Sequence, residues 1–153
     1  MKKITIILSL LLLGVFAIAQ PRGRHDDFEK YKALKVSFMT EKLELTPQEA
    51  QQFWPIYNEF DKKRFETHQK RRELEEQVKT NYDKYSESEF KKASYEIIDQ
   101  AVKESSLLKE YHEKFLRVLP AKKVVIIGQV ENEFRFKMIR EYRQREREGD
   151  DRK

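Results

Sequence analysis

A helix-start signal at Thr46 constrains the fold of this chain more than any other short stretch. Thr46 is a favoured N-cap residue, Pro47 suits the first helical position, and Glu49 completes a capping box. The sequence therefore predicts a helix that begins at Pro47. Its large apolar residues recur at three- and four-residue spacing and share one face: Phe53, Ile56, Tyr57 and Phe60.

That face is expected to pack in a core, as aromatic clusters on amphipathic helices usually do. The only tryptophan, Trp54, lies in the same segment, next to Pro55. A proline inside a helix removes one backbone hydrogen bond, so we expect a kink beside Trp54.

A second capping box, formed by Ser86 and Glu89, predicts another helix start after a turn at residues 81–88. The helix from Pro47 can continue to about Tyr82, and the next one to Leu119. Two long antiparallel helices joined by a short turn follow, which indicates an elongated all-α molecule. The expected heptad positions of the second helix are Phe90, Ala93, Ile97, Ala101, Leu108, Tyr111, Phe115 and Val118.

Shorter helices flank this hairpin. Apolar spacing predicts a first helix over about Asp27–Glu41 and a last one over about Pro120–Arg147. The residue before a proline is pushed out of the helical region, so Leu119-Pro120 marks a break or, alternatively, a kink in one continuous helix. The fold class is therefore all-α, with four helices.

The first residues have the features of a secretory signal peptide: Lys2 and Lys3, an apolar run, and Ala17-Ile18-Ala19 as a cleavage site. We expect cleavage after Ala19 and export to the periplasm; a retained membrane anchor is the alternative, although the apolar run is short for one. The predicted organisation is a signal peptide at 1–19, a flexible arm at 20–26, one helical domain at 27–147 and a flexible tail at 148–153.

Composition argues against several functional classes. The chain has no cysteine, and its formal net charge of +5 is modest for a nucleic-acid binder. No catalytic motif is present, and the three histidines have no metal-binding spacing, so we predict neither an enzyme nor a cofactor or metal site. Equilibrium dialysis without retained zinc, copper or nickel would test the remaining metal-sensing alternative. The histidines are His25, His68 and His112.

Basic residues beside an aromatic one suggest a surface for binding other proteins. The segment 61–72 combines six cations with a single large apolar side chain, Phe65. Such a surface could attract acidic, partly unfolded chains by long-range steering and hold them by apolar contact; an ordinary solvated surface is the alternative. The candidate client-binding residues are Lys62, Lys63, Arg64, Phe65, Lys70, Arg71 and Arg72.

The chain also contains a degenerate internal repeat. When Leu45 is aligned with Leu119, Asn58-Glu59-Phe60 aligns with Asn132-Glu133-Phe134. Chance similarity between two amphipathic helices is the alternative. If the repeat is real, both copies should lie at the base of the hairpin. The residues expected to form the motif and this packed base are Leu45, Thr46, Pro47, Glu49, Phe53, Trp54, Tyr57, Phe60, Leu119, Pro120 and Phe134.

The segment Leu45-Thr46-Pro47-Gln48-Glu49 resembles the Leu-Thr-x-x-Gln motif of the Spy and CpxP family of Gram-negative periplasmic stress proteins. Glu49 stands where that family has glutamine. In the second copy Pro120 replaces threonine and Lys123 replaces glutamine, so a role of the glutamine amides is not carried over.

The resemblance implies a cradle-like antiparallel homodimer. It also implies a function as an ATP-independent chaperone or adaptor for unfolded or misfolded clients in envelope stress. The alternative is a periplasmic sensor or regulatory protein that acts on a membrane signalling partner such as an anti-sigma factor or sensor kinase; a metal-responsive sensor is one form of this alternative. An amphipathic cradle fits both functions.

Overall fold

The computed structural model describes residues 22–150, with side chains described for residues 27–148. Every regular element in this range is helical, which confirms the all-α prediction. The expected signal peptide and its cleavage site lie outside the described residues. The helices are α1 (Arg22–Lys42), α2 (Pro47–Thr80), α3 (Glu87–Leu116), α4 (Ala121–Val124) and α5 (Ile127–Asp150).

The chain divides into two units, residues 1–36 and 37–153. The described part of the first unit is the amino-terminal portion of α1. The second unit holds the last turns of α1 and all the other helices, and all contacts described below lie within it.

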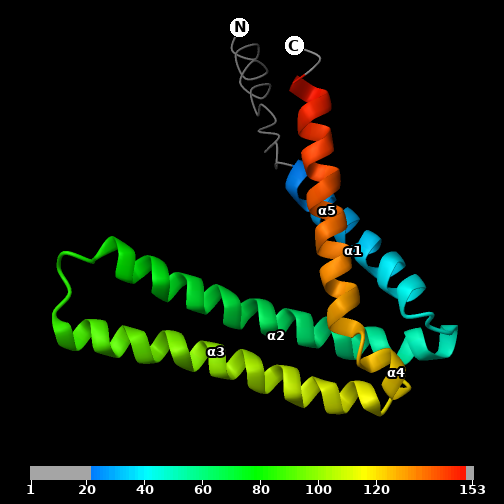
Figure 1. Ribbon diagram of the computed structural model, residues 1–153, viewed down its shortest axis with the longest axis horizontal. Helices are drawn as coiled ribbons and strands as arrows, with labels where there is room; N and C mark the ends of the chain where they lie inside the picture. The colour runs from blue at the N-terminus through cyan, green and yellow to red at the C-terminus, as the bar shows by residue number, and fades with distance from the viewer. Residues whose placement is uncertain (1–21, 151–153) are drawn as a thin grey trace, which may run out of the picture. The chain divides into compact units, whose positions relative to one another are not determined.

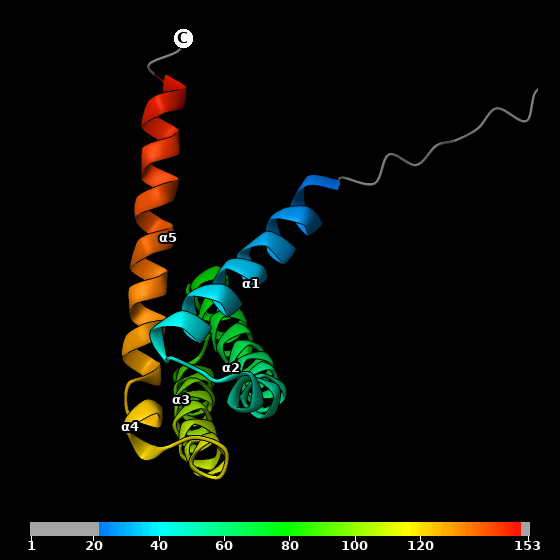
Figure 2. The same cartoon turned by 90° about the vertical axis from the view of Figure 1, so that its right-hand side faces the viewer.

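Helices α2 and α3 form the predicted long hairpin in the second unit, and they lie side by side in both views (Figures 1 and 2). α2 has 34 residues, which corresponds to a length of about 51 Å. Both predicted capping boxes are present, at Thr46 with Glu49 and at Ser86 with Glu89. Pro55 lies within α2.

The boundaries of α1 differ from the prediction. The helix begins at Arg22, not at Asp27, so residues 22–26 of the expected flexible arm are helical. The segment has no apolar periodicity, so its sequence carries no signal from which a helix could be predicted. At its other end, α1 finishes in a Schellman motif: the Glu44 N–H donates to the Glu41 carbonyl and the Leu45 N–H to the Thr40 carbonyl.

The predicted last helix is interrupted. α4 ends at Val124, and α5 begins at Ile127 and continues to Asp150, beyond the expected end at Arg147. Four consecutive β-branched residues, 124–127, span this interruption, and such side chains disfavour the helical backbone. The break before Pro120 is confirmed, since α3 ends at Leu116.

The hairpin is held together along one seam, to which α2 and α3 each contribute a row of residues. In both rows the spacing alternates between three and four residues, which is the pattern of coiled coils. At its base the seam is aromatic: the Phe60 ring lies 5.2 Å from Tyr111, and the Phe53 ring lies 5.3 Å from Phe115. Leu107 is buried, whereas the expected heptad residue Leu108 is exposed. The row of α2 contains Phe53, Tyr57, Phe60, Arg64, Thr67, Arg71, Leu74 and Val78, and that of α3 contains Ala93, Ile97, Gln100, Glu104, Leu107 and Tyr111.

The middle of this hairpin seam is polar. Thr67 is buried and donates its hydroxyl to the Lys63 carbonyl at 2.9 Å. Arg71 lies 3.7 Å from the Glu104 carboxylate on the opposite helix. The apolar contacts are therefore concentrated at the base of the hairpin, with a smaller group near its turn.

The N-cap of α2 gives a first testable prediction. Thr46 Oγ1 accepts the Glu49 N–H at 3.2 Å, while Glu49 Oε2 accepts the Thr46 N–H at 2.8 Å. Thr46→Ala is expected to lower the free energy of unfolding by about 1 kcal/mol, because one end of the capping box is lost. Urea unfolding followed by circular dichroism measures this, and Thr46→Ser is the control that keeps the hydroxyl. Equal stability of both variants would contradict the capping hydrogen bond to Thr46 Oγ1.

Candidate functional site

The motif residues lie at the base of the hairpin, where α1, α2 and the segment after α3 meet. Phe53, Tyr57, Phe60 and Leu119 belong to one buried core cluster, and Leu45 and Trp54 pack against it. The side chains that complete this cluster come from the end of α1 and the residue after it, from α3, from α4 and from the start of α5: Met39, Leu43, Leu107, Tyr111, Phe115, Val124, Ile127 and Val130.

Phe134 is also buried, and its ring centroid lies 5.6 Å from that of Phe38 in the last turns of α1. Pro120 and Pro47 are exposed at the starts of α4 and α2. The two prolines therefore mark helix starts, while the aromatic residues form the packed base.

The two motif copies touch each other through their last residues. Lys123 Nζ donates to Glu49 Oε2 at 2.8 Å and to the backbone carbonyl of Glu44 at 2.6 Å. Glu44 has a φ of 50°, which is uncommon for a residue with a side chain. Lys123 thus binds both the cap of α2 and the strained turn before it.

This ion pair predicts a specific pH dependence. The hydrogen bond from Lys123, together with those from Thr46, holds the pKa of the Glu49 carboxyl below its ordinary value of 4.5. A carboxyl whose pKa is lower in the folded state stabilises the fold above its unfolded pKa, and this contribution is lost as the pH falls through the folded pKa.

Lys123→Met should therefore raise the pKa of Glu49 toward 4.5, as measured by the chemical shift of its carboxyl carbon during titration. Lys122→Met, at an exposed neighbouring position, should leave the titration of Glu49 unchanged. A Glu49 titration that is the same in all three proteins would show that this pair does not form in solution.

A buried polar network connects α2 with α5. The Tyr57 hydroxyl donates to Glu131, and Arg64 binds both oxygens of the same carboxylate at 2.9 and 3.0 Å. Arg64 also donates to Asp61 at 2.9 Å. Burial, followed by the negative charge of Glu131, raises the pKa of the Tyr57 hydroxyl far above its ordinary value, so this hydroxyl remains a neutral donor. The network positions α5 against the hairpin base.

Both connections join residues 74 positions apart, which is the offset of the internal repeat. Glu49 pairs with Lys123, and Tyr57 pairs with Glu131. Equivalent residues of the two copies therefore contact each other at two positions. The repeat seen in the sequence thus corresponds to paired positions in the structure.

The candidate client-binding residues on α2 separate into two groups. Arg64 and Arg71 lie in the seam and bind carboxylates, and the Lys63 ammonium is 2.9 Å from Glu59. The other group faces solvent. Phe65 is 60% exposed, and the exposed cations of the segment are Lys62, Lys70 and Arg72. Lys62 and Lys70 form ion pairs on the exposed surface, with Glu66 and Glu73.

The internal position of Arg64 differs from the prediction, which placed this residue on the client-binding surface because of its charge. Its place was visible in the spacing, since Arg64 follows Phe53, Tyr57 and Phe60 in the same alternation of four and three residues. The prediction also left out Glu131. The repeat offset that aligns Phe60 with Phe134 also aligns Tyr57 with Glu131.

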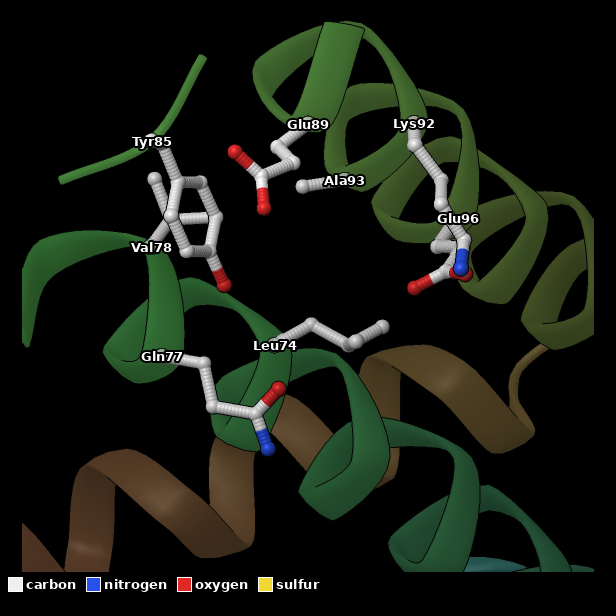
Figure 3. A pocket seen from close by; sticks show the side chains of 8 residues that line it. All are labelled: Leu74, Gln77, Val78, Tyr85, Glu89, Lys92, Ala93 and Glu96. Atoms are coloured by element: carbon white, nitrogen blue, oxygen red, sulfur yellow. The ribbon is translucent and has the colours of Figure 1, made fainter. Parts of the chain in front are cut away.

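A hollow of about 250 Å³ lies between α2 and α3 near the hairpin turn (Figure 3). Leu74, Val78 and the small side chain of Ala93 form its apolar part, and Tyr85 from the turn borders it. The remaining lining residues are Gln77, Glu89, Lys92 and Glu96. Lys92 and Glu96 form an ion pair at 3.8 Å on the surface of α3.

Among the side chains that the structure describes, no three His, Cys, Asp or Glu residues are grouped so as to hold a metal ion. His68 Nδ1 lies 3.0 Å from an Arg71 nitrogen, and His112 is exposed on α3. None of the described helices combines the length and the apolar character that a membrane span requires.

Comparison of the chain with family models, with curated proteins and with solved structures finds no match. The resemblance to the Spy and CpxP family therefore stays a prediction from the motif around Thr46.

Proposed function

We propose that this protein is exported to the periplasm and binds unfolded or misfolded proteins there without ATP, as a homodimeric chaperone or adaptor in envelope stress. The observation that carries the proposal is the solvent-facing group on α2, where Phe65 is 60% exposed and the exposed cations Lys62 and Arg72 lie three residues before it and seven residues after it. The motif at Thr46 and the signal-peptide pattern support it from the sequence.

The chemistry of this surface suits weak binding of many different chains. Exposed cations speed the encounter with acidic segments, and an exposed ring supplies apolar contact without requiring one shape. Arg64 and Arg71 are left out of the proposed surface, because internal carboxylates bind them.

Light scattering of a chemically unfolded, aggregating client tests the proposal. Metal-free mature protein, added without ATP at several ratios, should suppress aggregation at about one dimer per client. Absence of suppression would contradict the chaperone function and favour the regulatory alternative, which pull-down of a membrane signalling protein would then test.

A triple variant tests the electrostatic part of the proposal. Lys62→Gln, Lys70→Gln and Arg72→Gln together should slow client capture, and the effect should be larger at low salt because the Debye length is longer. The control neutralises three exposed lysines outside the segment: Lys79, Lys84 and Lys103. Equal capture rates for the two triple variants would exclude steering by this surface.

A further inference from the structure

The outer face of α3 carries an apolar stripe. Tyr95, Ile98 and Val102 are 62%, 59% and 58% exposed. Their spacing of three and four residues places them on one side of the helix. Single exposed apolar residues are ordinary on protein surfaces, but three on one face over two turns form a continuous contact surface.

The stripe is part of a longer row of positions along α3, which we call the outer seam. Its positions are 91, 95, 98, 102, 105 and 109, each two residues before a position of the seam that packs against α2. Two residues correspond to a rotation of about 200° around the helix, so the two seams lie on opposite faces. The alternation of four and three residues is the same in both, and it is the pattern that receives a neighbouring helix.

A lysine lies at each end of the outer seam. Lys91 and Lys109 are exposed, and among the described side chains neither forms an ion pair with a carboxylate. They are 18 positions apart, or about 27 Å along the helix. Between them the seam has no charged residue: it contains Tyr95, Ile98, Val102 and Ser105.

The charges decide between possible occupants. If the outer face of a second copy of α3 packed here with the two seams fully overlapped, Lys91 would face the Lys109 of that copy in the antiparallel direction. In the parallel direction each lysine would face its equivalent. Like charges opposite each other are unfavourable in both directions. A helix with carboxylates at both ends of an apolar stripe is complementary in either direction.

From this seam we infer that the outer face of α3 is a docking site for a helix of a partner protein, with apolar side chains in its middle and acidic residues about 27 Å apart at its ends. The site differs from the surface around Phe65 on α2, and the inference goes beyond the proposed chaperone function. It predicts binding of a folded helix of defined charge pattern, whereas the chaperone function requires no particular sequence.

Fluorescence anisotropy with two designed peptides tests the inference. Both are about 20 residues long and helical, with one leucine stripe; one carries glutamates at both ends and the other lysines. The mature protein should bind the glutamate peptide about tenfold more tightly, because two attractive surface pairs replace two repulsive ones. Equal affinity for the two peptides would overturn the inference.

Charge reversal makes the test specific. Lys91→Glu with Lys109→Glu should invert the preference, so that the lysine peptide binds better. The matched control, Lys92→Glu with Lys103→Glu, changes the net charge equally but on other faces of α3, and should keep the original preference. An unchanged preference in the first variant would assign the peptide binding to another surface.

The apolar part is tested by Ile98→Ser with Val102→Ser, which should remove binding of both peptides; the control is Phe136→Ser, at an exposed position of α5. All substituted side chains are exposed, and circular dichroism verifies that each variant is folded.

Binding to vesicles with one third anionic lipid is measured as a separate experiment. Binding to these vesicles without binding to either peptide would overturn the inference in favour of a membrane surface. Suppression of client aggregation, which tests the chaperone function, does not depend on the results of these binding experiments, so the two proposals can fail separately.

Discussion

Phe60→Ala is expected to lower the free energy of unfolding by about 4 kcal/mol, because it removes the ring at the centre of the aromatic base and leaves a cavity. Phe60 is 2% exposed, and its ring lies 5.2 Å from Tyr111 and 5.9 Å from Phe115. Urea unfolding monitored by circular dichroism measures the loss.

Phe65→Ala is the matched control, since it makes the same substitution five positions further along α2, where the ring is 60% exposed. Its effect on stability should stay within about 0.5 kcal/mol. Similar losses for the two variants would mean that α2 is rotated relative to the described hairpin.

Arg64→Leu is expected to lower the free energy of unfolding by about 3 kcal/mol, because the Glu131 carboxylate then stays in the core without its cation. The side chain of Glu131 is 10% exposed and that of Arg64 26%, so solvent compensates only partly for the lost pair. The same unfolding measurement applies. Arg72→Leu on the exposed side of α2 should change stability by less than about 0.5 kcal/mol.

A compensating variant separates the buried charge from the lost packing. Arg64→Leu and Glu131→Leu, combined with Tyr57→Phe, remove the whole network, and this triple variant should regain most of the stability lost in Arg64→Leu. If the triple variant were as unstable as Arg64→Leu, the loss would come from the missing arginine side chain and not from an unpaired carboxylate.

The long helices could be predicted because their ends are determined by local chemistry. Thr46 with Glu49 and Ser86 with Glu89 satisfy backbone N–H groups within their own turn, and Pro120 limits the residue before it. These signals need no information about the rest of the chain. The interruption after Val124 could have been predicted too, from the β-branched run that spans it.

The contacts of the candidate site were harder to predict, because they join distant parts of the chain. Nothing within one turn of Arg64 indicates that Glu131 will bind it, and a cation is ordinarily assigned to the surface. Leu107 lies in the seam and Leu108 does not, although the two are neighbours in the sequence. The apolar residues of α3 are spaced too irregularly to show which of the two faces α2.

The polar layer at Arg71 and Glu104 governs the register of the hairpin. Apolar residues on both sides of it would also associate if one helix slipped by seven residues along the other. Such a slip would bring Tyr111 or Ile97 to the place that Glu104 occupies, and would move the Glu104 carboxylate about 10 Å away from the Arg71 guanidinium. Loss of this partly buried pair between the helices is unfavourable, so the pair favours the observed alignment over the slipped ones. The aromatic base therefore contributes most of the stability of the hairpin, and the charged layer favours one alignment of its two helices.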